Sequence, residues 1–286
     1  MTGELAALPK VMIEDLVRNA LLEDFGRAGD LTTTATVPAG MRASAVLAAR
    51  QPGTVAGLDL AALAFELLDP AAEVVVSKGD GCRVGAGEEI ATITADARAL
   101  LSGERVALNF LGHLSGIATA TATLVDAVDG KCAVTCTRKT TPGLRAIEKY
   151  AVRCGGGVNH RTGLDDAVLI KDNHIALAGG VTAAVEQVLA QVGHLAAIEV
   201  EVDTLDQLRE LLEFSDRVDA VLLDNMEPAQ LREAVELIDG RLTAEASGRI
   251  TVETAPAIAE TGVDLISAGW LTHSAAVLDI GLDIQV

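Results

Sequence analysis

Residues 196–248 read AAIEVEVDTLDQLRELLEFSDRVDAVLLDNMEPAQLREAVELIDGRLTAEASG. Three short apolar runs, at 196–200, 220–223 and 242–246, alternate in this stretch with segments of helical character. This alternation predicts βα units, and consecutive units build a parallel sheet with right-handed crossovers. The polar residues that follow the three runs are Glu201, Asp224 and Ser247.

The same rhythm continues on both sides of this stretch. Further apolar runs lie at 132–137, 167–170 and 265–267, and they complete a set of six. The residues after these runs are Arg138 with Lys139, Lys171, and Gly269. In (β/α) barrels the carboxyl ends of the strands form one rim, so residues that are far apart in sequence meet there. Six units rather than eight predict an incomplete α/β barrel.

The N-terminal part of the chain has a different pattern. A helix is expected at 12–24, and β-branched runs separated by glycines predict a small antiparallel β unit over 43–94. A long helical stretch rich in Ala and Gly follows at 99–128. Its polar residues recur every four positions and form one stripe, which consists of Arg105, Asn109 and His113. We therefore expect two compact units.

Composition narrows the class of protein. Half of the 286 residues are hydrophobic and only 2% are aromatic, which suits an α/β core of small aliphatic side chains. We see no apolar run approaching about 20 residues and no basic-then-apolar N-terminus, so we expect a cytoplasmic protein with no membrane segment. The four cysteines form no C-x-x-C pair, and a chain of this size does not need disulfides.

The charge of the chain is strongly acidic, with 22 Lys and Arg against 41 Asp and Glu. A net charge of −19 argues against a nucleic-acid partner. Residues 138–171 nevertheless carry seven cations and three acids, as a site for a small polyanion requires. The alternative is a solvated basic helix face, and both readings stay open for Arg145, Lys149 and Arg153.

The cations at the predicted rim suit an anionic ligand with two carboxylates. The planar fork of arginine binds a carboxylate through two hydrogen bonds. Arg138 and Arg161, beside lysines and His160, could hold an aromatic dicarboxylate whose two acids point in different directions. Pairing with acids of the barrel is the alternative for any one of these cations.

Carboxylates and glycines at the rim suggest sites for a metal and a phosphate. Glu201 and Asp224 end successive strands, where such a pair holds Mg²⁺ or accepts hydrogen bonds from ribose hydroxyls. Glu199 shares the strand face of Glu201, so spacing alone does not choose between them. Backbone N–H groups after the last two strands are expected to bind phosphate, at Ser247, Gly248, Ala268 and Gly269.

Several runs of the sequence resemble the signature of the quinolinate phosphoribosyltransferase family, and the resemblance covers nearly the whole chain. The runs include TRKT at 137–140, KYAV at 149–152, GGGVNHR at 155–161 and IKDNH at 170–174. The resemblance implies an N-terminal α/β sandwich over 1–115, joined by the tail 272–286, and an incomplete α/β barrel over 116–271. The chain departs from the family at Arg249 and Trp270, where small or polar residues are usual, which leaves the phosphate-loop contacts open.

The resemblance also implies an activity and a site. The family forms nicotinate mononucleotide from quinolinate and phosphoribosyl pyrophosphate with release of CO₂, in NAD biosynthesis. The implied substrate-binding residues are Arg105 from a dimer partner, Thr137, Arg138, Lys139, His160, Arg161, Lys171, Glu201 and Asp224. Among them Lys139, Lys171, Glu201 and Asp224 are expected to be catalytic, and Glu201, rather than Glu199, matches the family's Mg²⁺ ligand together with Asp224. We expect a homodimer with a shared active site, and a higher oligomer is compatible with this.

Three other functions remain open from the sequence. A related phosphoribosyltransferase that acts on another pyridine or base would share parts of the motif set. A barrel aldolase would use Lys171 as a Schiff-base nucleophile. A non-catalytic protein would sense a phosphorylated metabolite through Ser247 and Gly269.

Overall fold

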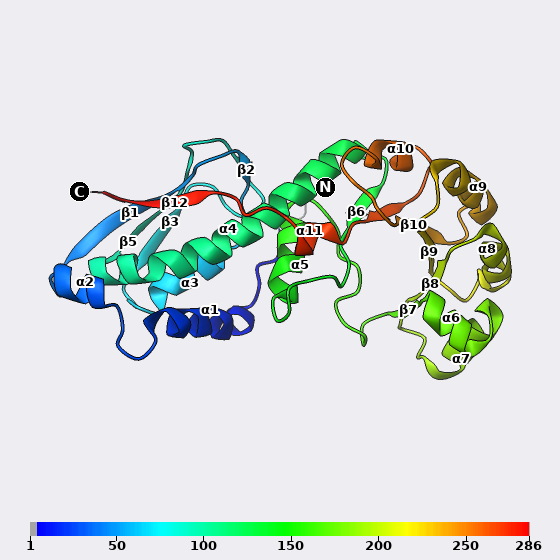
Figure 1. Ribbon diagram of the computed structural model, residues 1–286, viewed down its shortest axis with the longest axis horizontal. Helices are drawn as coiled ribbons and strands as arrows, with labels where there is room; N and C mark the ends of the chain where they lie inside the picture. Colours follow the sequence, from blue (N-terminus) through cyan, green and yellow to red (C-terminus); the bar gives the residue numbers. More distant parts are fainter. Residues whose placement is uncertain (1–4, 286) are drawn as a thin grey trace. The chain divides into compact units, whose positions relative to one another are not determined.

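The structure is a computed structural model that describes residues 5–285, and the chain divides into two compact units. The first unit contains the chain up to Ala122, residues 142–156 and the tail from Ser274. The second contains residues 123–141 and 157–273. Figure 1 labels the elements of both units.

The first unit is built on a four-stranded antiparallel sheet with the order β12-β1-β5-β3. Its strands are β1 (Arg42–Ala49), β3 (Glu73–Val76), β5 (Glu89–Asp96) and β12 (Ile280–Gln285), and β2 (Gly53–Thr54) pairs separately with β4 (Arg83–Val84). Strand β12 pairs with β1 along its whole length, from Ile280 opposite Ala49 to Gln285 opposite Ser44. The C-terminal tail therefore returns to the N-terminal unit, as predicted (Figure 1).

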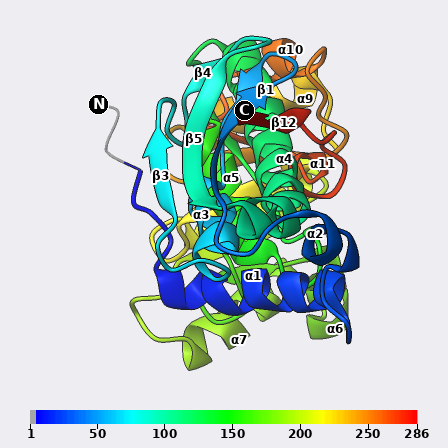
Figure 2. The ribbon, with the colours of Figure 1, turned by 90° about the vertical axis from the view of Figure 1, so that its left-hand side faces the viewer.

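The first unit also contains helices. They are α1 (Lys10–Phe25), α2 (Leu31–Thr36), α3 (Leu58–Glu66), α4 (Ala97–Val128) and α5 (Arg145–Cys154). Figure 2, in which the first unit faces the viewer, shows α3 and α4 on the same side of β1 and β5. Helix α1 packs on α3, so it forms a further layer outside the α3 and α4 layer.

Helix α4 is long and apolar enough to cross a membrane by length and composition, with a mean hydropathy of 1.2 in its most apolar window. The sequence shows no unbroken apolar run here because Ser, Thr, His and Gly interrupt the aliphatic residues that raise the mean. That window is 61% buried inside the protein, and Leu100, Leu111 and Ile117 are fully buried. Because Arg105 and Asn109 form an exposed stripe on the same helix, α4 has the pattern of a core helix.

Helix α5 packs with the first unit, although the sequence placed all of 116–271 in the barrel. The backbone of Gly155 at its end lies so close to α4 that an added Cβ would stand 2.4 Å from the carbonyl oxygen of Ala118. On the helix itself Lys149 is only 2% exposed, so the interpretation as a solvated basic face is wrong for this residue.

The second unit contains a parallel six-stranded sheet with the order β6-β11-β10-β9-β8-β7. The strands are β6 (Ala133–Thr135), β7 (Val168–Ile170), β8 (Ile198–Val202), β9 (Ala220–Asp224), β10 (Thr243–Ser247) and β11 (Leu265–Ser267). All six fall on the predicted apolar runs. Strands β6 and β7 form the two edges of the sheet, and Val158 forms one parallel bridge with Thr135 beside β6. The incomplete α/β barrel is therefore confirmed.

Helices follow the strands of the barrel and cover its outer side (Figure 1). They are α6 (Asp172–Ala178), α7 (Val181–Gln191), α8 (Leu205–Leu211) with the short 3₁₀ helix η1 (Leu212–Phe214), α9 (Pro228–Ile238), α10 (Ala255–Ala259) and α11 (Trp270–His273). Strand alternation sends buried aliphatic residues such as Val200 and Val221 toward the helices. The residues that alternate with these along each strand, including Glu201 and Leu222, line a cavity on the other face of the sheet.

Candidate active site

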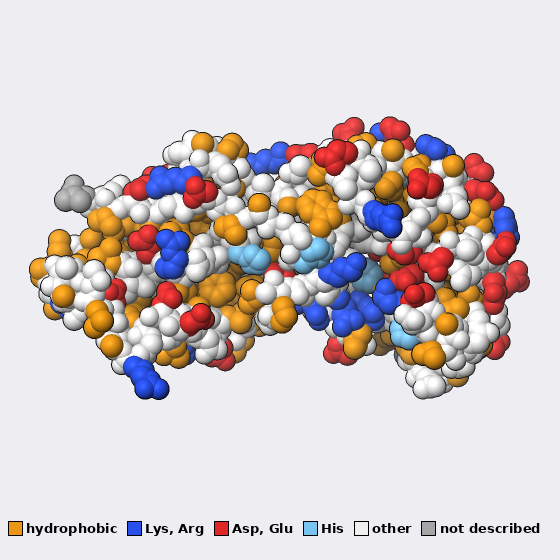
Figure 3. Space-filling view, in the orientation of Figure 1, with side chains coloured by type: hydrophobic (Ala, Val, Ile, Leu, Met, Phe, Trp, Pro, Cys, Tyr) orange, Lys and Arg blue, Asp and Glu red, His pale blue; other side chains and the backbone are white. Residues whose placement is uncertain are grey.

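A cavity of about 440 Å³ lies at the carboxyl ends of the barrel strands. Its lining residues are Thr137, Arg138, Lys139, His160, Arg161, Leu169, Lys171, Glu201, Leu222, Asp224, Glu245, Ser247 and Ser267, all from the second unit. The barrel thus brings together the cations and carboxylates that the sequence placed at the rim. Figure 3 shows Lys and Arg side chains gathered in one cluster on the viewed face, whereas Asp and Glu are spread over the surface around it.

The segment after β6 positions Lys139 through three neighbours. The hydroxyl of Thr137 accepts a hydrogen bond from the Lys139 backbone N–H at 3.0 Å, and the Thr272 hydroxyl donates to the Lys139 carbonyl at 2.8 Å. Gly269 lies against the lysine side chain, where an added Cβ would stand 2.8 Å from Lys139 Cδ. A side chain at 269 would therefore displace the Lys139 side chain from this position.

Two half-buried arginines line the cavity, and their Nε atoms have no partner among the described residues. Burial, and then the charge of Arg138, lower the pKa of Arg161, which remains far above neutral as for any arginine. Arg161 Nη1 donates to the Ala167 carbonyl at 3.3 Å, but the Nε atoms of Arg138 and Arg161 are buried and form no hydrogen bond. Buried donors normally have an acceptor, so a bound ligand is expected to supply one to each of these two Nε atoms.

The other buried side-chain atoms without a partner lie in the same cavity. Across residues 5–285, the buried and unpartnered side-chain N and O atoms belong to Arg138, Arg161, Glu245 and Ser267. Each of these four residues lines the 440 Å³ cavity. The polar groups that the fold leaves unsatisfied thus gather where a ligand would bind, and two of them are charge-bearing donors suited to carboxylates.

His160 was predicted to bind substrate, and both of its ring nitrogens have partners within the protein. Nδ1 accepts the backbone N–H of Arg161 at 2.9 Å, and Nε2 lies 2.7 Å from Glu199 Oε2. Because Nδ1 accepts a hydrogen bond, the proton of the neutral ring is on Nε2, which donates to Glu199. In this arrangement His160 fixes the backbone beside Arg161.

A metal at this histidine is disfavoured by the same tautomer. His160, Glu199 and Glu245 bring three potential ligand atoms within 4.8 Å of one another. A histidine nitrogen can bind a metal only through a lone pair, and the Nε2 of His160 carries the proton. The cluster is better described as a hydrogen-bonded pair, His160 with Glu199, next to a buried acid.

The structure separates Glu201 from Glu199, which spacing could not do. Glu201 lines the 440 Å³ cavity and forms an ion pair with Lys171, Nζ to Oε2 at 2.5 Å. Glu199 instead lines a second cavity of about 190 Å³, shared with Asp219. A Schiff-base lysine must present a neutral amine, whereas Lys171 is held in this ion pair, so the geometry does not favour the aldolase.

Sequence reasoning missed two polar residues of the cavity, Glu245 and Ser267. Glu245 is 3% exposed, and burial, followed by the charge of Glu199, raises its pKa to about 7. The available signal was strand alternation, since Glu245 lies two residues before Ser247 and therefore on the same face of β10. On β10 the sequence pattern points only to Ser247, the residue that ends the strand.

The predicted phosphate-binding residues differ in whether they are available to a phosphate. Ser247 lines the cavity, and Gly248 has a left-handed φ of 99°. The Ala268 N–H donates to the Thr135 carbonyl at 3.1 Å, so it is not available to a phosphate in this arrangement. The two departures from the family are accommodated: Arg249 is exposed with a φ of 52°, and Trp270 Nε1 donates to the Ile250 carbonyl at 2.8 Å.

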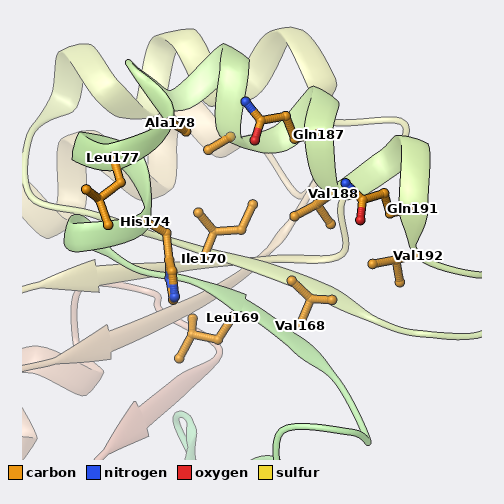
Figure 4. Close-up of a pocket in the computed structure, with 11 residues that line it drawn as sticks. Val168, Leu169, Ile170, His174, Leu177, Ala178, Gln187, Val188, Gln191 and Val192 are labelled. Atoms are coloured by element: carbon orange, nitrogen blue, oxygen red, sulfur yellow. The ribbon is translucent and has the colours of Figure 1, made fainter.

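A different cavity of about 430 Å³ lies between β7, α6 and α7 (Figure 4). Its lining is mostly aliphatic, with Gln187, Gln191 and His174 as its polar members and no Lys, Arg, Asp or Glu. His174 Nδ1 accepts the Lys171 backbone N–H at 2.9 Å. Because charged groups are lacking, this cavity does not suit a polyanionic substrate.

Comparison with known proteins agrees with this fold. Sequence models of the N-terminal and C-terminal domains of quinolinate phosphoribosyl transferase match residues 30–115 and 117–283. The nicotinate-nucleotide pyrophosphorylase [carboxylating] of Mycobacterium leprae is 46% identical, and the alignment covers 94% of this chain and 96% of that protein. The nicotinate-nucleotide pyrophosphorylase structure from Francisella tularensis superposes with a TM-score of 0.93 at 37% identity, covering 100% of both chains. The chain therefore belongs to the quinolinate phosphoribosyltransferase family.

Proposed function

We propose that this protein transfers the phosphoribosyl group of phosphoribosyl pyrophosphate to quinolinate and releases CO₂, which gives nicotinate mononucleotide and pyrophosphate. The observation that carries the proposal is the pair of buried, unpartnered Nε donors of Arg138 and Arg161. They lie in one cavity with Lys139, Lys171 and the carboxylates of Glu201 and Asp224. Such a cavity accommodates a dicarboxylate beside a pyrophosphate.

The experiment that tests this function supplies phosphoribosyl pyrophosphate with either quinolinate or nicotinate. We expect nicotinate mononucleotide and CO₂ in equal amounts from quinolinate, and no product from nicotinate, which cannot satisfy both arginines. Turnover of nicotinate at a comparable rate, or ribosylation of quinolinate without CO₂, would assign the chain to a transferase with another substrate.

In the proposed mechanism, positioning and electrostatics provide most of the catalysis. The two arginines hold the carboxylates of quinolinate so that its ring nitrogen faces C1 of the ribose. As the bond from C1 to pyrophosphate breaks, C1 gains positive character and the nitrogen lone pair forms the new bond. Lys139 stays beside the departing pyrophosphate and offsets its negative charge.

Mg²⁺ is the cofactor that we propose for this step, and Glu201 with Asp224 would hold it. Both are oxygen ligands on neighbouring strands and line the same cavity, and Mg²⁺ is commonly bound by one or two carboxylates together with substrate phosphates. When bound, Mg²⁺ would supply positive charge against the pyrophosphate oxygens. The ion pair with Lys171 holds the Glu201 carboxylate in place.

Decarboxylation follows from the new bond and needs no covalent cofactor. The ribosylated nitrogen is positively charged and stabilises the electron pair that remains on C2 when the adjacent carboxylate departs as CO₂. A proton then replaces CO₂ at C2. The arginines must bind the carboxylate without stabilising it more than the transition state for its loss.

We further propose that the enzyme is a cytoplasmic homodimer in which Arg105 completes the active site of the partner subunit. Arg105 lies on the exposed stripe of α4, and its side chain forms no hydrogen bond or ion pair with any residue in the described range 5–285. A two-fold axis would present two such stripes symmetrically, one to each partner. An intrachain salt bridge near Glu104, the simpler alternative, has no support from these contacts.

Mixing two inactive variants tests the shared site. Subunits with Arg105→Ala and subunits with Lys171→Ala should each be inactive alone, but a heterodimer of the two has one intact site. Random reassortment should restore roughly a quarter of wild-type activity. No recovery in a sample with demonstrated heterodimers would exclude the shared site.

A further inference from the structure

Asn225 follows the proposed Mg²⁺ ligand Asp224 and connects it to the turn after β10. Its side-chain Nδ2 donates to Asp224 Oδ2 at 2.5 Å, and its backbone N–H donates to the Ser247 carbonyl at 2.9 Å. One residue therefore contacts both the carboxylate on β9 and the turn that is expected to bind phosphate. The other oxygen of Asp224 is left for a ligand in the cavity.

The backbone of Asn225 is held in a conformation that few residues adopt. Its φ is 54°, in the left-handed region, where asparagine is among the better tolerated residues other than glycine. The neighbouring turn has the same character, since φ is 99° at Gly248 and 52° at Arg249. Backbone strain of this kind persists where the surrounding contacts enforce it, and it gathers at binding sites.

Gly248 packs directly against Asn225. A Cβ added at Gly248 would stand 2.2 Å from Asn225 Oδ1 and 2.9 Å from Asn225 N. The turn can therefore lie against Asn225 only because residue 248 has no side chain. On its far side the turn is fixed by Trp270, whose Nε1 donates to the Ile250 carbonyl at 2.8 Å. The turn has little freedom to compensate for a displaced Asn225.

We infer that Asn225 is a positioning residue that fixes the Asp224 carboxylate and the Ser247–Gly248 turn as one unit for phosphoribosyl pyrophosphate. The inference rests on the proposed roles of Asp224 and this turn. Asn225 acts through them and makes no contact with quinolinate, which the arginines bind. Loss of the Asn225 side chain therefore weakens the binding of phosphoribosyl pyrophosphate and leaves the binding of quinolinate unaffected.

Two substitutions separate the amide from the backbone conformation. Asn225→Gly keeps the left-handed conformation and removes the side chain. Asn225→Asp keeps the shape, but it replaces the donor to Asp224 with a carboxylate that repels it. The matched control is Asp239→Gly, at an exposed residue with a φ of 48° at the other end of α9. It makes the same kind of backbone change outside the cavity.

Both Asn225 variants should raise the KM for phosphoribosyl pyrophosphate roughly tenfold or more, as the loss of a hydrogen bond to a charged group implies. The concentration of Mg²⁺ needed for half-maximal rate should rise with it. The Kd of quinolinate, measured by calorimetry, should stay within about twofold of wild type, and Asp239→Gly should change neither value. This split between substrates is the readout that a general loss of folding would not produce.

Two results would overturn the inference: an unchanged KM for phosphoribosyl pyrophosphate in either Asn225 variant, or an equal weakening of both substrates. Asp224→Ala, measured beside them, separates this failure from that of the proposed function. If Asp224→Ala loses activity and the Asn225 variants do not, only the positioning role is wrong. If Asp224→Ala turns over as wild type does, the proposed metal and ribose role of Asp224 is wrong as well.

Discussion

Each of the two units of the protein contains a His–Glu pair among other polar side chains. The first cluster comprises His113, Glu148, Tyr150 and Asp80, and the second comprises Glu199 and the polar side chains that line the 440 Å³ cavity. In the first unit His113 Nε2 lies 2.9 Å from Glu148 Oε1, and the Tyr150 hydroxyl donates to Asp80 at 2.8 Å. In the second unit His160 Nε2 lies 2.7 Å from Glu199 Oε2. The pairs have similar chemistry and geometry, but their surroundings differ.

The difference lies in which polar atoms are left without a partner. Among the described residues, every buried side-chain N or O atom that lacks a hydrogen bond belongs to the second cluster's cavity, and none belongs to the first unit. A closed cluster stabilises the fold, because its groups satisfy one another. An open cluster holds groups whose partner must come from a ligand. Substitutions in the two clusters should accordingly affect different properties, and this can be tested.

The largest effect is expected for Asp224→Ala, in the open cluster. Without this carboxylate the charge of departing pyrophosphate lacks compensation by Mg²⁺, so kcat/KM should fall by roughly three orders of magnitude. Thermal unfolding should be unchanged, because Asp224 is only partly buried. The matched control is Glu236→Ala, an exposed acid on α9 outside the cavity. Undiminished turnover of wild type in excess chelator would contradict the metal role.

Arg161→Lys should have the next largest effect, and it should act on one substrate. An ammonium cannot reproduce the two parallel hydrogen bonds of a guanidinium, so quinolinate affinity should fall by about two orders of magnitude. The affinity for phosphoribosyl pyrophosphate should change by less than about threefold. Calorimetry with each ligand separately measures both values. Equal losses for the two ligands would mean that Arg161 does not discriminate between them.

Part of the fold and of the site is predictable from the sequence alone. The six barrel strands were predictable because each is a short apolar run that ends in a polar or small residue, and the convergence of those ends follows from barrel geometry. Residues inside a strand were harder to recognise. Glu245 stands between alanines in TAEAS, and only its position on the inward face of β10 shows that it lines the cavity.

Other features depend on contacts that have no local signal. The choice between Glu199 and Glu201 is made by their partners, His160 and Lys171, which lie on other segments. The Ala268 N–H was expected at a phosphate but is used in the sheet. The allocation of α5 to the first unit likewise depends on packing against α4, since its sequence continues the barrel rhythm without a visible break.

A smaller effect, on the pH dependence of stability, is expected for Glu245→Gln, also in the open cluster. Burial raises the pKa of Glu245 from its ordinary 4.5 to about 7, so between these pH values the folded protein binds a proton that the unfolded chain does not. The resulting stabilisation is complete below the ordinary pKa and is lost as pH rises through 7. Wild type should therefore lose on the order of 2 kcal/mol between pH 5 and 8, and Glu245→Gln should not.

The single tryptophan makes this measurable within the barrel, because Trp270 belongs to the second unit. Urea unfolding followed by its fluorescence at both pH values gives the change for that unit. An identical pH dependence in wild type and Glu245→Gln would show that Glu245 does not carry the buried proton.

The smallest effect is expected in the closed cluster, for Tyr150→Phe. Burial and the nearby Asp80 raise the pKa of Tyr150, so its hydroxyl remains a donor to Asp80 at neutral pH. The substitution removes that one hydrogen bond, while Asp80 still accepts the backbone N–H groups of Gly57 and Leu58 at 2.9 and 3.2 Å. Unfolding followed by circular dichroism should show a loss of about 1 kcal/mol, and the KM values of both substrates should stay within twofold of wild type. A large rise in either KM without a loss of stability would mean that the first cluster also serves the active site, and the distinction between the closed and the open cluster would be wrong.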